Sequence, residues 1–332
     1  MLKVLYVSAW GRSGTTIVDN VLNGYPGVFS AGELRYVWRR GLIAKQSCGC
    51  GAPVRECPLW RDVLKVAFGD ALPNAREVVA MQRRITRARR TPSLLRRDWP
   101  DEARTYADVM ARLYRAIGEV TGASLVVDSS KLPSEAAMLA RRPDLETYLL
   151  HMVRDPRGVA YSWSRQKLHP DRGTFMLQHG PAKSTVNWLA WNALAGLVSR
   201  HYDGRFRLLR YEDLVADPRG QIESLLDLVG IPTADGPFLD RRTVRLTPNH
   251  TVSGNPGRFS VGDIEIRDDD RWRAEQPLRQ RLTASTLALP MSILYRYPVW
   301  PRPRPEPAAR PGSIVPPRPR DPDERSAHQE TP

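Results

Sequence analysis

The sequence lacks any apolar run close to the ~20 residues that a membrane-spanning helix requires, because Arg or Asp interrupts each candidate within a few positions. The first apolar stretch, residues 4–10, is too short for the core of a secretory signal, and no small-residue cleavage site accompanies it. Cysteine is scarce as well, since Cys48, Cys50 and Cys57 are an odd number and give no disulfide framework. We therefore expect a cytoplasmic protein with no transmembrane segment.

Lysine is rare too, with six residues among the 50 Lys+Arg, which exceed the 36 Asp+Glu and give a net charge of +14. Residues 298–332 hold six Arg and five acidic residues, a net of +1, so the remaining +13 belongs to residues 1–297. Residues 76–104 carry nine Arg against four acidic residues. Such a run is more often a solvated helix face than a binding site, and we favour that interpretation.

The end of the chain has an unusual composition. Of the 29 prolines, 11 fall in residues 298–332. Proline fixes φ and has no amide hydrogen, so this segment cannot join a helix or a central strand. We predict a folded domain over residues 1–297 and a disordered Pro/Arg-rich tail over residues 298–332.

Short apolar strand patterns alternate with helical patterns along the domain. This alternation predicts an α/β fold with a central parallel sheet that is covered by helices on both faces. In such sheets ligands bind beyond the carboxyl ends of the strands. The predicted strands cover residues 3–9, 124–128, 145–153 and 206–210, and helices begin near residues 15, 133, 188 and 218. A further helix follows residues 154–158 and runs through Ser164.

The loop after the first predicted strand reads GRSGTT, residues 11–16. Glycines let the backbone turn around an anion, the following helix offers free N–H groups, and Arg12 adds a fork of donors. The loop therefore predicts a phosphate cradle, with a Gly-rich turn capped by Ser or Thr as the alternative. The nucleoside triphosphatase motif requires a Lys where Thr15 stands, so that motif is absent.

Three segments in order carry a family resemblance: RSGTT, VRDPRGVAYSWSR and RYEDLVADP. Together they resemble the sulfotransferases that use 3′-phosphoadenosine 5′-phosphosulfate (PAPS), over residues 2–229 and more weakly to 259. The resemblance implies a P-loop-NTPase-like three-layer sandwich.

The resemblance also implies a donor site. It assigns the 5′-phosphosulfate to the first loop, the 3′-phosphate to an Arg and Ser eight positions apart, and the adenine to a Tyr. The positions in this chain are Arg12, Ser13, Gly14, Thr15 and Thr16, then Arg154 with Ser162, and finally Tyr211. The structural alternatives are an ion pair for Arg154, a helix-surface hydroxyl for Ser162 and a half-buried aromatic for Tyr211, and without the first loop we would favour them.

Two further residues have the chemistry of catalytic groups. Glu33 lies 21 positions after Arg12, as does a Gly-Glu in tyrosylprotein sulfotransferases, and this likeness implies a general base; a helix-capping Glu is the alternative. Lys131 follows a predicted strand, and its compact ammonium suits a bridging oxygen. The resemblance implies that Lys131 stabilises the leaving group together with Arg12, whereas a helix cap or a partner for Asp128 would be structural.

Histidine offers another base. His151 lies inside a strand and is expected in the core, while His169, His179 and His250 lie in loops. His250 is the next choice after Glu33. It precedes GNPGR, residues 254–258, which resembles the loop that closes over the nucleotide in bacterial members of the family. Asn255 and Arg258 are therefore implied phosphate contacts.

The three cysteines could bind Zn²⁺ only with a fourth ligand, and neither a further Cys nor a His is near them in the sequence. We expect no metal, and we interpret residues 48–120 as a helical, Cys-containing insertion near the acceptor site. Residues 56–119, together with 166–185, are expected to build the acceptor pocket.

The resemblance implies transfer of a sulfuryl group from PAPS to the hydroxyl of a small molecule or glycan, with release of adenosine 3′,5′-bisphosphate. One alternative is a small-molecule kinase built on the same loop. It lacks the motif Lys, and Asp128 is its only carboxylate at a strand end. Another alternative is a nucleic-acid-binding protein, suggested by the net charge and by residues 76–104. We expect no nucleic-acid partner.

Overall fold

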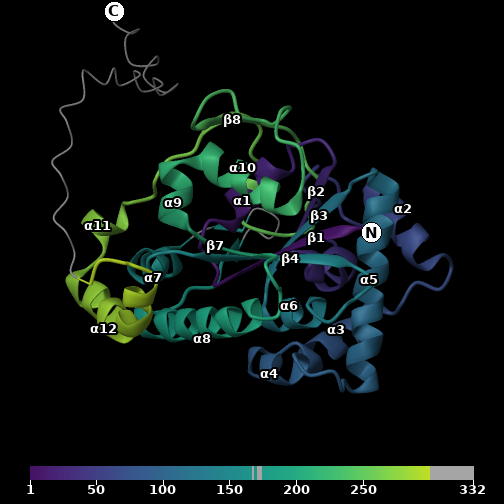
Figure 1. Ribbon diagram of the computed structural model, residues 1–332, viewed down its shortest axis with the longest axis horizontal. Helices are drawn as coiled ribbons and strands as arrows, with labels where there is room; N and C mark the ends of the chain where they lie inside the picture. Colours follow the sequence, from purple (N-terminus) through teal and green to yellow (C-terminus); the bar gives the residue numbers. More distant parts are fainter. Residues whose placement is uncertain (167, 170–173, 300–332) are drawn as a thin grey trace, which may run out of the picture. The chain divides into compact units, whose positions relative to one another are not determined.

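The computed structural model describes residues 1–166, 168–169 and 174–299, and its compact unit is Met1–Val299. A five-stranded parallel sheet with the order β2-β3-β1-β4-β7 runs through this unit (Figure 1). The strands are β1 (Lys3–Ala9), β2 (Val28–Gly32), β3 (Leu125–Lys131), β4 (Glu146–Val153) and β7 (Phe206–Arg210). The expected α/β fold with a parallel sheet is confirmed.

The two faces of β1 contribute to two separate cores because side chains alternate along a strand. Val4 and Tyr6 pack into one hydrophobic cluster, whereas Leu5 and Val7 pack into another. The second cluster is covered by helices on the upper side of the sheet in Figure 1. These are α1 (Thr15–Leu22), α9 (Tyr211–Ala216) and α10 (Pro218–Val229).

The opposite face is covered largely by the region interpreted as an insertion. Its tryptophan and tyrosine side chains share the first hydrophobic cluster with Val4 and Tyr6, so the region forms one of the two helical layers. Its helices are α2 (Pro58–Phe68), α3 (Ala75–Ile85), a 3₁₀ turn (Ala88–Arg90), α4 (Thr91–Leu94) and α5 (Asp101–Thr121). They are joined by α6 (Pro133–Leu139) and by α8 (Pro181–Ser199), which runs beneath the sheet in Figure 1.

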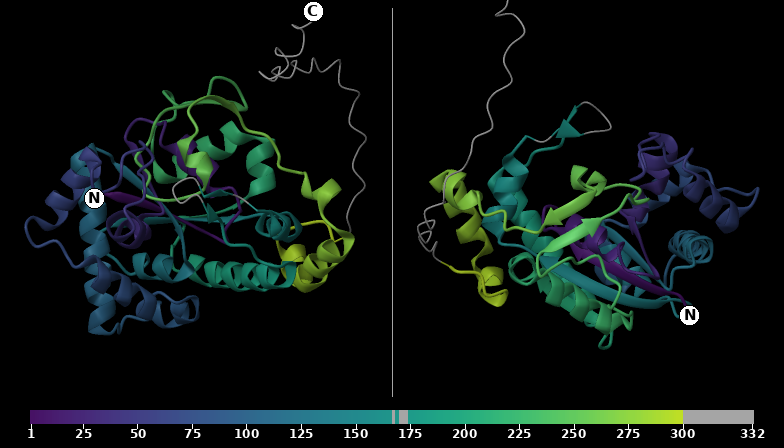
Figure 2. Two further views of the ribbon diagram at one scale, coloured as in Figure 1. Left: turned by 180° about the vertical axis from the view of Figure 1, so that it is seen from behind. Right: turned by 90° about the horizontal axis from the view of Figure 1, so that it is seen from above.

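The remaining elements surround the carboxyl edge of the sheet. Buried residues of α7 (Pro156–Ser164), α8 and α12 (Leu278–Leu294) form a third small cluster. The fold also has two short antiparallel strand pairs, and the pair β8–β9 is seen in light green in the right-hand view of Figure 2, from above. These pairs are β5 (Leu168–His169) with β6 (Thr174–Phe175), and β8 (Thr243–Leu246) with β9 (Gly262–Glu265). The remaining helices are short and lie at Leu34–Tyr36, Val37–Ile43 (a π-helix), Pro256–Phe259 and α11 (Trp272–Glu275).

The basic run 76–104 behaves as a solvated face, since each of its nine arginines is exposed. Among the described helices, none combines the length and apolarity needed to cross a membrane. The predicted tail falls almost entirely on residues 300–332, which lie outside the described residues.

Candidate active site

The loop after β1 turns sharply into α1. Gly14 adopts φ +91° at the N-cap, and a Cβ there would lie 2.6 Å from Cδ2 of Tyr211, so this position requires glycine for conformation and for space. Ser13 donates from Oγ to the Trp10 carbonyl at 2.7 Å and holds the turn closed. Thr15 and Thr16 begin the helix. Glycine has no side chain to cap α1, so the first amide groups remain available for an anion.

Arg12 lies over this loop with φ +75°, a left-handed conformation that is strained for a residue with a side chain. Its guanidinium donates to Oδ1 of Asn255 at 2.5 Å and stacks over the Trp163 ring at 5.0 Å. Burial lowers the pKa of Arg12, while the nearby Glu33 carboxylate counteracts this effect. The contacts with Asn255 and Trp163 fix the Arg12 side chain within the loop of residues 11–16.

Lys131 and Glu33 meet at the carboxyl ends of β3 and β2. The pairing of β1 with β3 shifts register between Tyr6 and Ser8, and irregularities of this kind often re-aim side chains beside functional sites. Lys131 has φ +74°, and its Nζ donates to Glu33 Oε1 at 2.5 Å. Each side chain is 13% exposed, so this ion pair is largely shielded from solvent.

Two residues that the sequence did not single out complete the setting of Glu33. Arg40 donates to its Oε2 at 3.1 Å, and Ser253 Oγ donates to the same oxygen at 3.2 Å. Burial alone would raise the pKa of Glu33, but Lys131 and Arg40 lower it to about 2. Glu33 is therefore an ionised carboxylate held between two cations.

Arg154 leaves the end of β4 and is buried under the first loop. It donates to the Arg12 carbonyl at 3.3 Å and to the Asp269 carbonyl at 2.8 Å, and it covers the Tyr211 ring at 4.3 Å. Tyr211 is 3% exposed, and its hydroxyl accepts from the Asp269 amide at 3.1 Å. Ser162 is buried on α7 at the same edge. The carboxylate that pairs with Arg154 is that of Asp269, at 3.5 Å. The adjacent Asp155 pairs with Arg157 instead.

Residues 249–258 bring a distant part of the chain to the cleft. Asn255 reaches Arg12, and Ser253 reaches Glu33, across more than 200 positions. Arg258 behaves differently, because its guanidinium donates to the carbonyls of Thr251 at 2.8 Å and Ser47 at 2.7 Å. Its described contacts hold the loop together, and it does not line the cleft.

Among the histidines whose side chains the structure describes, none lines the cleft with Glu33. His151 is buried in β4 as expected, beside Asn192, and burial lowers its pKa to about 4. His250 lies among the cysteines, with Nδ1 3.3 Å from Cys57 Sγ. His179 packs on the Trp163 ring, with centroids 4.5 Å apart, and the side chain of His169 lies outside what the structure describes.

The cleft formed by these loops has a volume of about 390 Å³. Arg12, Glu33, Lys131 and Asn255 line it together, which unites residues from four separate segments of the chain. The other walls are largely aromatic and apolar, a feature that sequence motifs did not reveal. They include Trp10, Tyr36, Trp163, Phe175, Met176, Leu177 and Trp191. Among the described lining residues, three come from 166–185 and none comes from 56–119.

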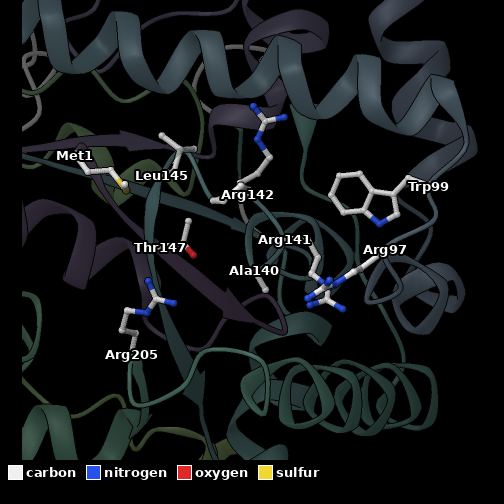
Figure 3. Close-up of a pocket in the computed structure, with 10 residues that line it drawn as sticks. Met1, Arg97, Trp99, Ala140, Arg141, Arg142, Leu145, Thr147 and Arg205 are labelled. Atoms are coloured by element: carbon white, nitrogen blue, oxygen red, sulfur yellow. The ribbon is translucent and has the colours of Figure 1, made fainter.

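A second cavity, of about 540 Å³, opens at the opposite edge of the sheet (Figure 3). Its lining includes Met1, Leu145 and Arg205, which precede β1, β4 and β7. Arg97 and Arg142 add positive charge to it. Because ligands of parallel α/β sheets bind beyond the carboxyl ends of the strands, the cleft and not this cavity is the candidate active site.

Asp128 does not offer a free carboxylate for a magnesium ion. Its Oδ2 accepts from the Tyr114 hydroxyl at 2.5 Å, and its Oδ1 accepts from the amide and hydroxyl of Ser130 at 2.8 and 2.5 Å. The residue is 1% exposed. This arrangement weighs against the kinase alternative, which needs a metal ligand at a strand end.

The fold and the site define an α/β protein with a glycine-containing loop and a polar cleft at the carboxyl edge of its sheet. The family model described as "Sulfotransferase domain" matches residues 136–248, about a third of the chain. Carbohydrate sulfotransferase 1 of Rattus norvegicus is 26% identical over 151 residues, which are 41% of this chain and 35% of that protein. The match thus spans about a third of the length of the curated relative.

Solved sulfotransferase domains are also similar to the chain. The domain from the curacin biosynthetic pathway is 17% identical, with a TM-score of 0.49, and covers 88% of this chain and 98% of its own. The domain from the Synechococcus PCC 7002 olefin synthase is 22% identical, with a TM-score of 0.45, and covers 87% of this chain and 94% of its own.

Proposed function

We propose that the protein transfers a sulfuryl group from PAPS to an acceptor hydroxyl and releases adenosine 3′,5′-bisphosphate. The observation that carries this proposal is the Glu33–Lys131 pair in the cleft beside Arg12 and the loop of residues 11–16. A base, a compact cation and an anion-binding loop are the groups that sulfuryl transfer requires. The family match supports the class of reaction.

In this proposal the donor lies along the carboxyl edge of the sheet. The amide groups of Ser13, Gly14, Thr15 and Thr16 and the guanidinium of Arg12 hold the 5′-phosphosulfate. Arg154 and Ser162 hold the 3′-phosphate from β4 and α7. Tyr211 supports the floor of the site beneath Arg154 and Gly14, and the adenine contact proposed for it uses the ring edge, because Arg154 covers one face.

The acceptor oxygen attacks sulfur as the bond from sulfur to the bridging phosphate oxygen breaks, and the electron pair of that bond stays with the departing phosphate. Glu33 takes the acceptor proton, while Lys131 and Arg12 stabilise the charge that grows on the bridging oxygen. A pKa of about 2 keeps Glu33 ionised at neutral pH but also makes it a weak base. The donor anion competes for the Lys131 ammonium and so leaves Glu33 more basic during turnover.

The aromatic walls favour an acceptor with an apolar face. Trp10 packs against two other tryptophans that line the cleft, with its ring centroid 5.5 Å from that of Trp163 and 4.9 Å from that of Trp191. Sugar rings present C–H faces to such surfaces and hydroxyls at their edges. A carbohydrate acceptor fits this chemistry and agrees with the name of the rat relative.

Calorimetric titration of the full chain with adenosine 3′,5′-bisphosphate tests the donor site, with ATP–Mg²⁺ as the competing ligand. We expect tighter binding of the bisphosphate; absence of binding, or preference for ATP–Mg²⁺, would refute the proposal. A transfer assay with radiolabelled PAPS against free sugars, glycans and phenols then tests the acceptor class. If only phenols were labelled, the proposed sulfuryl transfer would stand, and a carbohydrate acceptor would be refuted.

A further inference from the structure

Four side chains with metal-binding atoms converge beside the cleft. Cys48, Cys50, Cys57 and His250 place their sulfur and nitrogen atoms within 4.8 Å of one another. We propose that they form a structural zinc site that fastens the loop of residues 249–258 to the segment 48–57. Sequence motifs could not reveal the fourth ligand, because His250 is 193 positions from Cys57.

Three of the separations between these atoms are close to those of a tetrahedral metal site. Zinc–sulfur bonds of about 2.3 Å and zinc–nitrogen bonds of about 2.0–2.1 Å give sulfur–sulfur separations of about 3.8 Å and sulfur–nitrogen separations of about 3.6 Å in a tetrahedron. Cys50 and Cys57 sulfurs are 3.8 Å apart. Nδ1 of His250 is 3.6 Å from the Cys48 sulfur and 3.3 Å from the Cys57 sulfur.

A disulfide does not explain this grouping. The sulfurs of Cys50 and Cys57 are far beyond the ~2.05 Å of a disulfide bond, and all three cysteines are free. Simple core packing does not explain it either, because Cys50 is exposed and His250 is polar. Three thiols and an imidazole around one point are the ligand set of structural zinc sites.

The backbone around the cysteines is shaped to hold a cation. Gly51 adopts φ +92° and closes a tight turn in which its amide donates to the Cys48 carbonyl at 2.9 Å. A Cβ at Gly49 would lie 2.0 Å from Asn249 Oδ1, so only glycine lets the two segments approach so closely.

The site would act on the cleft through the loop that it fastens. All four positions are protein ligands, so no coordination position remains for a substrate and the metal is structural. His250 is held further by its carbonyl, which accepts from Trp60 Nε1 at 2.7 Å. Ser253 and Asn255 follow within five positions and contact Glu33 and Arg12. A metal at His250 would therefore limit the motion of both contacts.

Metal analysis of the purified, tag-free full chain tests the inference. After dialysis against metal-free buffer we expect about one zinc ion per chain. Cys50→Ser changes an exposed ligand and should weaken zinc affinity more than about tenfold in competition with a chromogenic chelator. His201→Gln, a histidine outside the cluster, is the matched control and should retain the metal. Protein that neither carries zinc nor binds added zinc would overturn the inference.

Cobalt substitution distinguishes this site from surface binding even if a variant fails to fold. The Co²⁺ form of the unmodified chain should show intense visible bands and thiolate-to-cobalt charge transfer, which are typical of tetrahedral sulfur coordination. Weak octahedral bands, or iron in place of zinc, would refute the assignment. Chelation should also increase amide hydrogen exchange in residues 249–258 while the sheet stays protected; unchanged exchange in that loop would refute the fastening role.

Discussion

Two cavities with arginines in their walls lie at opposite edges of the same sheet and differ in how their charges are held. At the carboxyl edge, Glu33 is buried between Lys131 and Arg40, and Arg12 and Lys131 both have positive φ. At the amino edge, Arg97 is exposed, and Arg142 forms ion pairs with Asp108 and Asp144 at the surface. Positive charge alone is therefore uninformative, whereas shielded and strained charge at strand ends indicates a site.

The largest expected effect distinguishes the two edges directly. Lys131→Ala removes the cation assigned to the leaving group and should reduce turnover by about 100-fold or more. Arg97→Ala removes a cation from the other cavity and should leave turnover unchanged. Initial rates of sulfate transfer measure both, and equal losses in the two variants would remove the distinction between the cavities.

Arg12→Ala should weaken binding of adenosine 3′,5′-bisphosphate by about 10- to 100-fold, because a charge-assisted contact contributes about 1.5–3 kcal/mol. Its contact with Asn255 is lost as well. Calorimetry measures the affinity, with Arg97→Ala again as the control. Unchanged affinity in the Arg12 variant would show that the first loop does not hold the nucleotide.

Gly14→Ala tests whether the backbone of the loop at the carboxyl edge is strained and tightly packed. The new methyl group would meet Tyr211 at 2.6 Å in a left-handed conformation, so we expect a loss of stability of about 1–3 kcal/mol together with weaker nucleotide binding. Gly196→Ala, inside α8 with open space around it, should instead stabilise the protein by about 0.5–1 kcal/mol. Thermal unfolding separates the two, and a neutral Gly14→Ala variant would contradict the tight packing of the loop.

The smallest expected effect concerns Asp128, behind the site. Burial raises its pKa to about 7, above the value of about 4 in an unfolded chain. The folded state then binds the proton more tightly, so the free energy of unfolding falls as pH rises from about 4 to about 7. Asp128→Asn should make the free energy of unfolding depend less on pH in this range. Part of the dependence should remain, because burial also raises the pKa of Asp19, to about 6. Urea titrations at several pH values measure the slope, and a slope identical to that of the unmodified chain would contradict the assignment.

Local patterns predicted the central strands well. The boundaries of β1 and β7 are as predicted, and the N-terminus of α10 at Pro218 and the Gly230 that ends it follow from ordinary helix signals. The exact extent of β2 and the β8–β9 pair were missed, because these strands are short. In α12 the internal Pro290 and a mixed polar surface hide the helical pattern.

In the candidate site too, some residues could be predicted from the sequence and others only from the structure. Arg12, Glu33 and Lys131 follow strand ends, so a one-dimensional pattern could find them, and the structure brings them into one cleft. Arg40 and Ser253 could not be found in this way, since their importance lies in a contact with Glu33 that only the folded chain creates. For the same reason, the sequence did not reveal that His250 lies beside the three cysteines. The sequence likewise did not reveal the carbonyl contacts of Arg258, for which the family resemblance implied a phosphate contact.

Glu33→Gln provides the most direct test of the central claim that Glu33 is the base in a preformed donor site. The amide keeps the shape of the side chain and cannot accept the acceptor proton in the same way. Parallel measurements of nucleotide affinity and single-turnover sulfate transfer should show affinity nearly intact and transfer reduced by about 100-fold or more. Transfer at the full rate in this variant would contradict the account.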